Sequence, residues 1–374
     1  MKKILMITGE ASGDIYGADL ARHLYKQTPL RIMGIGGERM RDAGVDILFN
    51  SSDISVVGLS EVLPRLKAIK QAYRMVKDLI KSRSVDFVIL IDYPGFNIRI
   101  AGVAKRAGIP VVYYISPQIW AWRKGRLRLL AKRVTKMIVI LPFEEVIYKD
   151  AGVDCSFTGH PLVDEILSIR PIEETISRYG IDKDSPVIGL FPGSRIGEIN
   201  SLLPDILEAA LILKSSNPQL QFIMAVADSL DFNFIKDIVS KSPLNIQMIR
   251  GEANDVLNIC DVIIAASGTI TLQAALFEKP MVVLYRLSRV THAIAKLLIH
   301  INDVGLVNIL AGKKIVPELL QNDVTPDKIA SEVKKILYNK EYHEKIIKDL
   351  HEVRSKLGPP GASERIAKVI AGML

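Results

Sequence analysis

The feature that most constrains the fold is an alternation of short apolar runs with longer amphipathic segments, which occurs twice along the chain. Apolar runs of this length predict buried strands, and strands that alternate with helices predict a parallel, doubly wound sheet. In the first half the predicted strands are Ile4–Thr8, Arg31–Ile35, Phe87–Ile91, Val111–Ile115 and Met137–Leu141. After a polar, charged stretch at Ser168–Ser185 the pattern restarts with Val187–Phe191, Phe222–Val226, Ile246–Ile249, Val262–Ala265 and Met281–Leu284.

The restart predicts two Rossmann-like α/β domains that face each other across a cleft. A chain of 374 residues is also too long for one ordinary hydrophobic core. We place the boundary near residue 168, with a first domain over 1–168 and a second over 169–354. The last segment, about 355–374, contains a predicted helix over Ser363–Leu374 and is expected to pack back on the first domain.

Bulk composition limits the class of protein. Hydrophobic residues make up 49% and charged residues 24%, as in a globular protein. The two cysteines, Cys155 and Cys260, match no zinc or redox spacing and suit a reducing compartment as buried thiols. No apolar stretch approaches the roughly 18 residues that span a bilayer, so a soluble or peripheral protein is expected. The net charge of +8 fits nucleic acid, anionic lipid or a phosphorylated substrate as partner.

Ligands of an open parallel sheet bind beyond the carboxyl ends of its strands, so residues just after predicted strands are the first candidates. Gly9–Asp14 follows the first strand and contains Glu10, Ser12 and Asp14. Its glycines do not follow the GxGxxG pattern of dinucleotide-binding proteins. The segment is either a ligand loop or a plain turn in which Ser12 or Asp14 caps a helix from about Tyr16 to Gln27.

A second candidate loop is Asp92-Tyr93-Pro94-Gly95-Phe96-Asn97. Asp92 follows a fully apolar run and is expected to emerge at the strand end, where a carboxylate could act as a general base toward a sugar hydroxyl. The alternative is a turn-forming Asp before a Pro-Gly turn.

Two segments are rich in basic and aromatic residues. Ser116–Arg123 holds both tryptophans of the chain, Trp120 and Trp122, and Trp120–Lys136 has seven basic residues and no acidic one. Val62–Arg83 predicts a basic amphipathic helix. Such segments suit an anionic membrane surface or a phosphorylated ligand, and they could also stack on nucleic acid. Solvated basic helices with two structural tryptophans are the alternative.

Two loops of the second half follow predicted strands and suit phosphate. Gly193-Ser194-Arg195 offers backbone amides and a guanidinium, and Ser267-Gly268-Thr269 precedes a predicted helix. Together they predict a nucleotide-diphosphate site. His160, in Gly159-His160-Pro161, either contacts the ligand or shapes the hinge, and we favour the hinge. No HxxxH, DxD or carboxylate cluster predicts a metal.

These segments resemble those of lipid-A-disaccharide synthases, in the same order along the chain. Gly9–Asp14 resembles the family's GExSGD motif, and Ser116–Arg123 resembles its SPxxWAWR motif. Further similar segments are Gly159–Pro161, Gly193–Arg195, Ser267–Thr269, Asn308–Gly312 and Pro317–Gln321. The resemblance therefore extends from about residue 8 to 321.

The resemblance implies a GT-B fold and a metal-independent, inverting glycosyl transfer with no cofactor. The donor would be a UDP-linked diacylated glucosamine, and the acceptor a diacylated glucosamine 1-phosphate. Asp92 would be the acid/base residue. The substrate-binding residues would be Glu10, Ser12, Asp14, Trp120, Arg123, Gly193, Ser194, Arg195, Ser267, Gly268, Thr269, Gln273 and Asn308. The protein would be cytoplasmic and peripheral on the inner face of the bacterial inner membrane, without a nucleic-acid partner, and a homodimer is compatible with the sequence.

Two positions depart from the family pattern. Gly95 stands where the family commonly has Asp, and Gln273 stands where related enzymes usually carry a ribose-binding Glu. Two other functions stay open at this point. One is an isomerase like UDP-N-acetylglucosamine 2-epimerase, which needs no lipid acceptor. The other is a protein that binds RNA or a membrane without catalytic activity. The two predicted nucleotide-binding loops argue against this second function, because such a protein does not need them.

Overall fold

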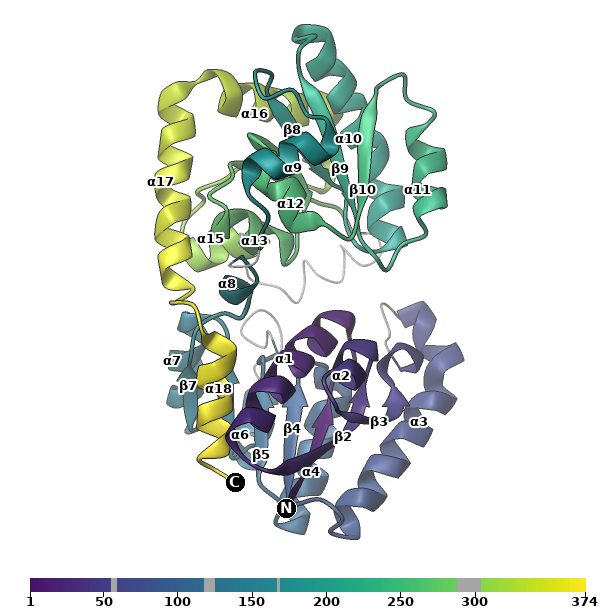
Figure 1. Cartoon of the computed structure of the whole chain (residues 1–374), viewed down its shortest axis with the longest axis vertical. Helices are drawn as coiled ribbons and strands as arrows, with labels where there is room; N and C mark the ends of the chain where they lie inside the picture. The colour runs from purple at the N-terminus through teal and green to yellow at the C-terminus, as the bar shows by residue number, and fades with distance from the viewer. Residues whose placement is uncertain (55–58, 118–124, 167–168, 288–303) are drawn as a thin grey trace. The chain divides into compact units, whose positions relative to one another are not determined.

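A computed structural model describes residues 1–54, 59–117, 125–166, 169–287 and 304–374. The chain divides into two compact units (Figure 1). Unit 1 consists of Met1–Asp164 and Leu357–Leu374, and unit 2 of Glu165–Lys356. The division after Asp164 lies four residues before the boundary expected from the sequence.

Unit 1 is built on a parallel sheet of seven strands in the order β3-β2-β1-β4-β5-β6-β7. Each pair of neighbours is parallel; Ile4 of β1, for example, lies beside Ile32 of β2 and Phe87 of β4. The strands are β1 (Lys2–Ile7), β2 (Leu30–Gly36), β3 (Asp46–Asn50), β4 (Phe87–Ile91), β5 (Val111–Tyr114), β6 (Lys136–Val139) and β7 (Cys155–Phe157).

Helices cover both faces of this sheet, which explains why its central strands are apolar at every position rather than at alternate ones. Ile4 and Met6 pack with α1 and α18 in one core cluster, whereas Leu5 and Ile7 pack with α3, α4 and α6 in the other. The helices are α1 (Ala11–Gln27), α2 (Glu38–Asp42), α3 (Leu59–Lys81), α4 (Pro94–Ala107), α6 (Gly125–Arg133), α7 (Pro142–Asp150), α8 (Leu162–Glu165) and α18 (Ala362–Ala371).

The last helix of the chain belongs to unit 1. Ile366 and Ile370 of α18 share a core cluster with Leu20 and Leu24 of α1, and Figure 1 shows α18 in yellow beside α1. Arg365 of α18 also donates a hydrogen bond through Nε to the carbonyl of Thr158 at 2.9 Å. The end of the chain therefore completes the core formed by its beginning.

Unit 2 has a six-stranded parallel sheet in the order β10-β9-β8-β11-β12-β13. Its strands are β8 (Val187–Phe191), β9 (Gln221–Val226), β10 (Ile246–Arg250), β11 (Val262–Ala266), β12 (Met281–Tyr285) and β13 (Glu318–Leu320). Its helices are α9 (Ile172–Tyr179), α10 (Ile196–Ser216), α11 (Phe232–Val239), α12 (Ala253–Ile259), α13 (Ile270–Leu276), α15 (Leu306–Ala311), α16 (Pro326–Tyr338) and α17 (Lys340–Lys356).

The first helix starts earlier than the sequence pattern predicts. It begins at Ala11 rather than near Tyr16, and Glu10 occupies the N-cap instead of Ser12 or Asp14. Gly13 and Gly17 lie inside the helix because it packs closely on its neighbours. A Cβ on Gly13 would lie 1.9 Å from Thr8 Oγ1, and one on Gly17 would lie 2.7 Å from Met40 Sδ.

Three strands, β3, β7 and β13, were not predicted from the sequence. All three lie at the edge of a sheet, and β7 and β13 have only three residues each. Edge strands are short and partly polar, so they lack the continuous apolar run by which the buried strands are recognised.

Candidate active site

In both units the candidate loops lie where the strand order reverses. In unit 1 the chain runs outward from β1 to β3 and returns to the other side of β1 with β4. In unit 2 the corresponding neighbours are β8 and β11. The crevice beyond the carboxyl ends of two such strands is the usual ligand site of an open parallel sheet. Glu10 and Asp92 follow β1 and β4, while Arg195 and Ser267 follow β8 and β11.

The backbone of Asp92 is held in an uncommon conformation by buried donors. Its φ is +45°, and that of Tyr93 is +47°, in the left-handed region that non-glycine residues seldom adopt. The carbonyl oxygen of Asp92 accepts hydrogen bonds from Asn97 Nδ2 at 2.8 Å and from Tyr113 Oη at 2.6 Å. Its amide donates to the Tyr114 carbonyl at 3.0 Å. Strained residues of this kind cluster at functional sites.

The carboxyl group of Asp92 has a strongly raised pKa. Burial, which disfavours the charged form, is the main cause, and the negative charge of Glu10 adds to it. The backbone amide of Tyr93 acts in the opposite direction, and the resulting pKa is about 7 instead of 3.8. A carboxyl group that is half ionised near neutral pH is well matched to general-base catalysis.

The loops after β1 and β4 pack against each other through Tyr93. A Cβ on Gly9 would lie 2.3 Å from the Tyr93 ring, so this position needs a glycine. The same ring stacks on Phe96 at a centroid distance of 5.7 Å, and Tyr93 Oη donates to the Ile54 carbonyl at 2.6 Å. Gly95, by contrast, has open space around it, so the Asp that is common in the family would fit there.

Of the predicted ligands after β1, Asp14 has an internal role. Its carboxylate accepts backbone N–H bonds from Gly37 at 2.6 Å, Arg39 at 3.0 Å and Met40 at 3.2 Å, so it caps the start of α2. These bonds explain a buried carboxylate without a ligand. Glu10 is half-buried at the start of α1, and Ser12 is exposed in its first turn. The predicted ligands Trp120 and Arg123 lie outside the described residues.

A cavity of about 350 Å³ opens at the carboxyl ends of the unit 2 strands. It contains every predicted nucleotide-binding residue of the two loops, together with Gln273 on α13. The predicted residues that line it are Gly193, Ser194, Arg195, Ser267, Gly268, Thr269 and Gln273. A pocket of this size with convergent polar groups suits a nucleotide.

The wall after β8 combines a cation with the start of a long helix. Arg195 is the N-cap of α10, whose 21 residues give a full helix dipole at this end. Its side chain is 54% exposed, and its Nη1 lies 3.4 Å from Glu198 Oε1. This end of the cavity is therefore suited to an anion.

The wall after β11 is fixed by hydrogen bonds of its own hydroxyl and amide groups. Ser267 Oγ donates to the Val304 carbonyl at 3.0 Å, and Thr271 Oγ1 donates to the Gly268 carbonyl at 2.9 Å. Gln273 Nε2 lies 3.4 Å from Asn254 Oδ1, so its amide nitrogen has a protein partner. The carbonyl oxygen of Gln273 is thereby the atom suited to accept a hydrogen bond from a ligand hydroxyl.

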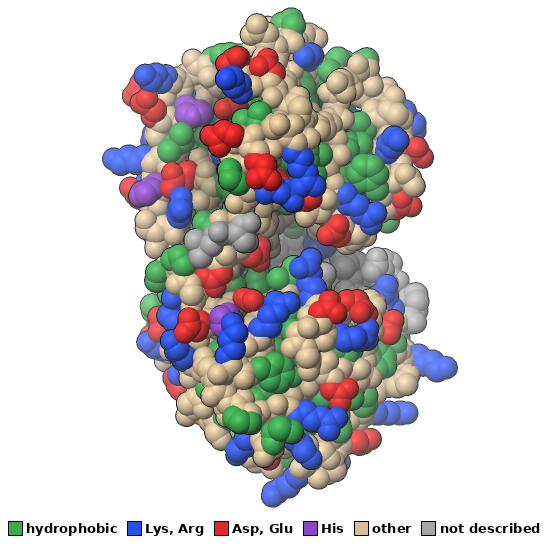
Figure 2. Space-filling model, in the orientation of Figure 1, with side chains coloured by type: hydrophobic (Ala, Val, Ile, Leu, Met, Phe, Trp, Pro, Cys, Tyr) green, Lys and Arg blue, Asp and Glu red, His purple; other side chains and the backbone are tan. Residues whose placement is uncertain are grey.

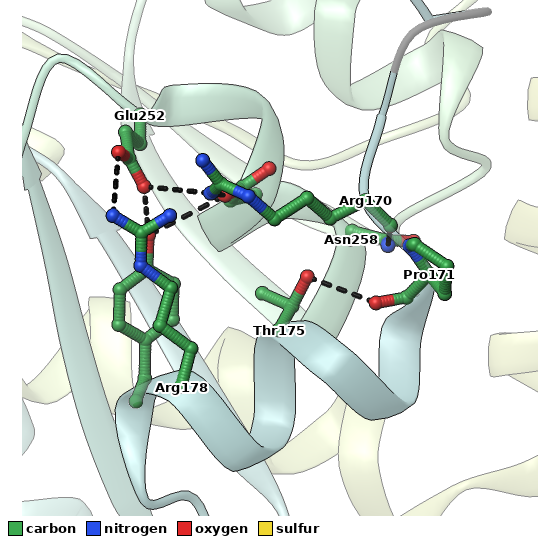
Figure 3. A network of polar contacts seen from close by, with 8 residues as sticks. Arg170, Pro171, Thr175, Arg178, Glu252 and Asn258 are labelled. Carbon is green, nitrogen blue, oxygen red and sulfur yellow. Dashed lines mark hydrogen bonds and ion pairs between the residues drawn. The ribbon is translucent and has the colours of Figure 1, made fainter.

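A polar network anchors a third wall of the cavity, formed by Gly251 and Ala253. Glu252, between them, accepts from Arg170 and from Arg178, each at 3.1 Å, and also from the Tyr179 hydroxyl (Figure 3). The Tyr179 hydrogen bond is the main cause of the lowered pKa of Glu252, so this carboxylate is ionised at neutral pH. The network joins α9 to the start of α12 and thus fixes the backbone on either side of Glu252.

Two further candidates are occupied within the protein. Asn308 is fully buried and does not line the cavity. Its Nδ2 donates to the Val316 carbonyl and to Glu318 Oε1, and its Oδ1 accepts from the amides of Ile315 and Val316. His160 is buried in unit 1, where its Nδ1 accepts from the Leu162 amide at 3.1 Å. Burial lowers the His160 pKa to about 3, so it is neutral at physiological pH.

Within the described ranges no group of three or more His, Cys, Asp or Glu side chains is arranged to hold a metal ion. The helices of those ranges also include none that is long and apolar enough to cross a membrane. Both cysteines are buried and unpaired.

Comparison with known proteins identifies the family. The family model described as lipid-A-disaccharide synthetase matches residues 4–371. The chain belongs to the lipid-A-disaccharide synthase family. A lipid-A-disaccharide synthase of Geobacter sulfurreducens is 44% identical over 373 residues, which cover 100% of this chain and 97% of the relative. One from Myxococcus xanthus is 40% identical with the same coverage. The chain is thus a hexosyltransferase of lipid A biosynthesis.

Solved structures confirm the GT-B fold expected for this family. A UDP-GlcNAc 2-epimerase from Neisseria meningitidis bound to UDP-GlcNAc has a TM-score of 0.69 at 15% identity and covers 99% of this chain and 100% of its own. MurG of Acinetobacter baumannii has a TM-score of 0.59 at 13% identity, with 100% of both chains covered. At these identities the likeness concerns the fold alone.

Several residues that shape the site were not recognised from the sequence. Tyr113 and Asn97 hold the Asp92 carbonyl, Glu198 lies in the cavity of unit 2, and Glu252 anchors one of its walls. Tyr113 gives no signal because it lies in a buried apolar strand. For Glu198 the signal was available: an acidic residue in the first turn of a helix that follows a phosphate-type loop.

Proposed function

We propose that this chain transfers a diacylated glucosamine from UDP to a diacylated glucosamine 1-phosphate. The products would be the β-1,6-linked lipid A disaccharide 1-phosphate and UDP. The observation that carries the proposal is that one cavity collects all seven predicted nucleotide-binding residues, in a chain that matches the family over residues 4–371. Unit 2 would bind the UDP part of the donor, and unit 1 would supply the base for the acceptor.

In the proposed reaction, Asp92 accepts the proton of the acceptor's primary hydroxyl. The hydroxyl oxygen forms a bond to the anomeric carbon of the donor, while the bond from that carbon to the diphosphate breaks. The electron pair leaves with UDP, whose new negative charge is stabilised by Arg195 and the N-terminus of α10. Because the pKa of the Asp92 carboxyl group is about 7, this group can be a carboxylate before the transfer and a carboxylic acid after it.

Product analysis tests this function. The protein is incubated with the UDP-diacylglucosamine donor, with or without the diacylglucosamine 1-phosphate acceptor, and the lipids are analysed by mass spectrometry. We expect the disaccharide 1-phosphate and UDP only when both substrates are present. Consumption or isomerisation of the donor without acceptor would contradict transfer and would favour an epimerase-like activity instead.

We also propose that unit 1 binds the anionic surface of the inner membrane, from which both lipid substrates must come. Unit 1 holds 27 Lys and Arg against 17 Asp and Glu, a net charge of +10, whereas unit 2 has 22 against 24, a net charge of −2. The helices α3, α4 and α6, which cover one face of the sheet, carry 13 basic and two acidic residues. Figure 2 shows many Lys and Arg side chains in blue on unit 1.

Flotation with vesicles tests the membrane contact. Lys105 and Arg106 are exposed on α4 and line a hollow with Arg133. Replacing both by Glu should reduce binding to phosphatidylglycerol vesicles, because each basic residue near such a surface contributes about 1 kcal/mol. The matched control replaces Lys345 and Lys348, exposed on α17 of unit 2, by Glu. Equal binding of both variants would contradict this placement of the membrane contact.

A further inference from the structure

The nucleotide cavity of unit 2 already contains an anion of the protein itself. Glu198, in the first turn of α10, lines the cavity beside Gly193, Ser194 and Arg195. Its side chain is 26% exposed. A carboxylate is an unexpected wall for a site whose ligand carries a diphosphate.

The Glu198 carboxylate occupies donors that a phosphate would use. Its Oε2 accepts the Ser194 amide hydrogen at 2.9 Å, and its Oε1 lies 3.4 Å from Arg195 Nη1. Backbone amides and arginine are the groups that bind phosphate in such loops. In the structure both are directed at the same side chain.

The loop is shaped to admit this side chain. Gly193 has a φ of +122°, and a Cβ at this position would lie 2.4 Å from Glu198 Oε2. Only glycine allows the carboxylate to lie so close to the loop backbone. The pKa of Tyr285, at the end of β12, is raised mainly by burial. The charge of Glu198 raises this pKa further, and the charge of Arg195 lowers it. Arg195 and Glu198 both line the cavity.

We propose that Glu198 is an internal competitor for the diphosphate of the nucleotide. In the free protein its carboxylate holds the Ser194 amide and the Arg195 guanidinium, and the nucleotide must displace it from both. This inference rests on the proposed UDP site and adds a specific consequence. UDP ends in a phosphate monoester and carries more negative charge than the diester of a UDP-sugar, so the carboxylate opposes the product more than the donor and promotes product release.

Calorimetric titration of the full-length protein with UDP and with uridine tests the proposal. Glu198→Gln keeps the size and hydrogen-bonding oxygen but removes the competing charge. We expect it to bind UDP about three- to tenfold more tightly than the wild type, and uridine with unchanged affinity. The product-inhibition constant of UDP should fall by more than the KM of the donor. Glu208→Gln is the matched control, since it removes an exposed carboxylate from the same helix, and it should leave both affinities unchanged.

A second variant, Glu198→Ala, keeps the test informative if the glutamine variant is unstable, and melting temperatures identify such a case. Tighter binding of UDP by either folded variant supports the proposal. UDP binding by both variants that equals or is weaker than that of the wild type would overturn the proposal. Glu198 would then only stabilise the loop at Ser194. If the wild-type protein itself does not bind UDP, the proposed function fails. If it binds UDP and the variants do not tighten, only the role of Glu198 fails.

Discussion

The raised pKa of Asp92 predicts a pH dependence that an ordinary carboxyl group would not give. The base acts in its ionised form, so kcat/KM should rise with pH until the group is fully ionised. With a pKa of about 7, the Asp92 carboxyl is ionised in about one-eleventh of the molecules at pH 6 and in about ten-elevenths at pH 8. We therefore expect kcat/KM to rise about tenfold over this range. A carboxyl group with the ordinary value of 3.8 would give a flat profile.

The perturbation that isolates this effect is Glu10→Gln. Glu10 is the second cause of the raised pKa after burial, and its neutralisation should move the acid limb of the profile to lower pH. We expect the ratio of the activity at pH 6 to the activity at pH 8 to be higher for the variant than for the wild type.

The assay follows initial UDP release from pH 5.5 to 8.5 at constant ionic strength. Comparison of the variant with the wild type cancels the titration of the substrate phosphates, which is common to both. Glu364→Gln is the control, because Glu364 lies on α18, is 51% exposed and pairs with Lys368. A flat wild-type profile, or an acid limb that Glu10→Gln leaves in place, would refute the assignment of Asp92 as a base with a raised pKa.

Four further predictions concern single side chains. The folded protein holds the Asp92 proton up to about pH 7 and the unfolded chain releases it near 3.8, so wild-type stability falls as pH rises through this window. Asp92→Asn should therefore raise the melting temperature at pH 8, by the equivalent of at most about 4 kcal/mol. Below pH 4 the substitution should leave the melting temperature unchanged. An equal effect at both pH values would contradict the raised pKa of Asp92. Arg195→Lys should weaken UDP binding about tenfold, because lysine lacks the planar fork; unchanged affinity in calorimetry would exclude Arg195 as a diphosphate ligand. Gly95→Asp should raise the melting temperature by the equivalent of about 1 kcal/mol, because the site is open and lies in the first turn of α4. Glu252→Gln should lower the melting temperature and also weaken UDP binding, because the three side chains that donate to Glu252 fix a wall of the cavity. Loss of stability without loss of UDP affinity would show that this network does not shape the UDP site.

The buried strands and the loops that follow them could be predicted from the sequence for a physical reason. A strand covered by helices on both faces must be apolar throughout, so Phe87–Ile91 and Val187–Phe191 are recognised with the bounds that the structure has. Asp92 and Gly193 then mark the points where the chain leaves the core. Strand order is not encoded in such local patterns, and it is the order that places these loops at the reversal of each sheet.

The roles of individual polar residues could not be predicted, because they depend on partners distant in sequence. Asp14 looks like a ligand in the sequence, but it caps a helix that begins 24 residues later, at Glu38. Asn308 looks like a ligand in a family motif, but its amide is used within the core. Glu198 looks like an ordinary residue of a helix, but it lies among the predicted phosphate ligands. A local sequence pattern predicts the helix, strand or loop to which a residue belongs. Its contact partners depend on the tertiary fold.

The most direct test of the account is single-turnover transfer by Asp92→Asn with purified donor and acceptor. Asn has the size of Asp but cannot accept the proton of the acceptor hydroxyl. We predict a loss of at least about a hundredfold in the transfer rate, with UDP affinity within twofold of the wild type, since the UDP site that we propose is the cavity of unit 2. Transfer at near wild-type rate would contradict the central claim that this carboxylate is the base of the reaction.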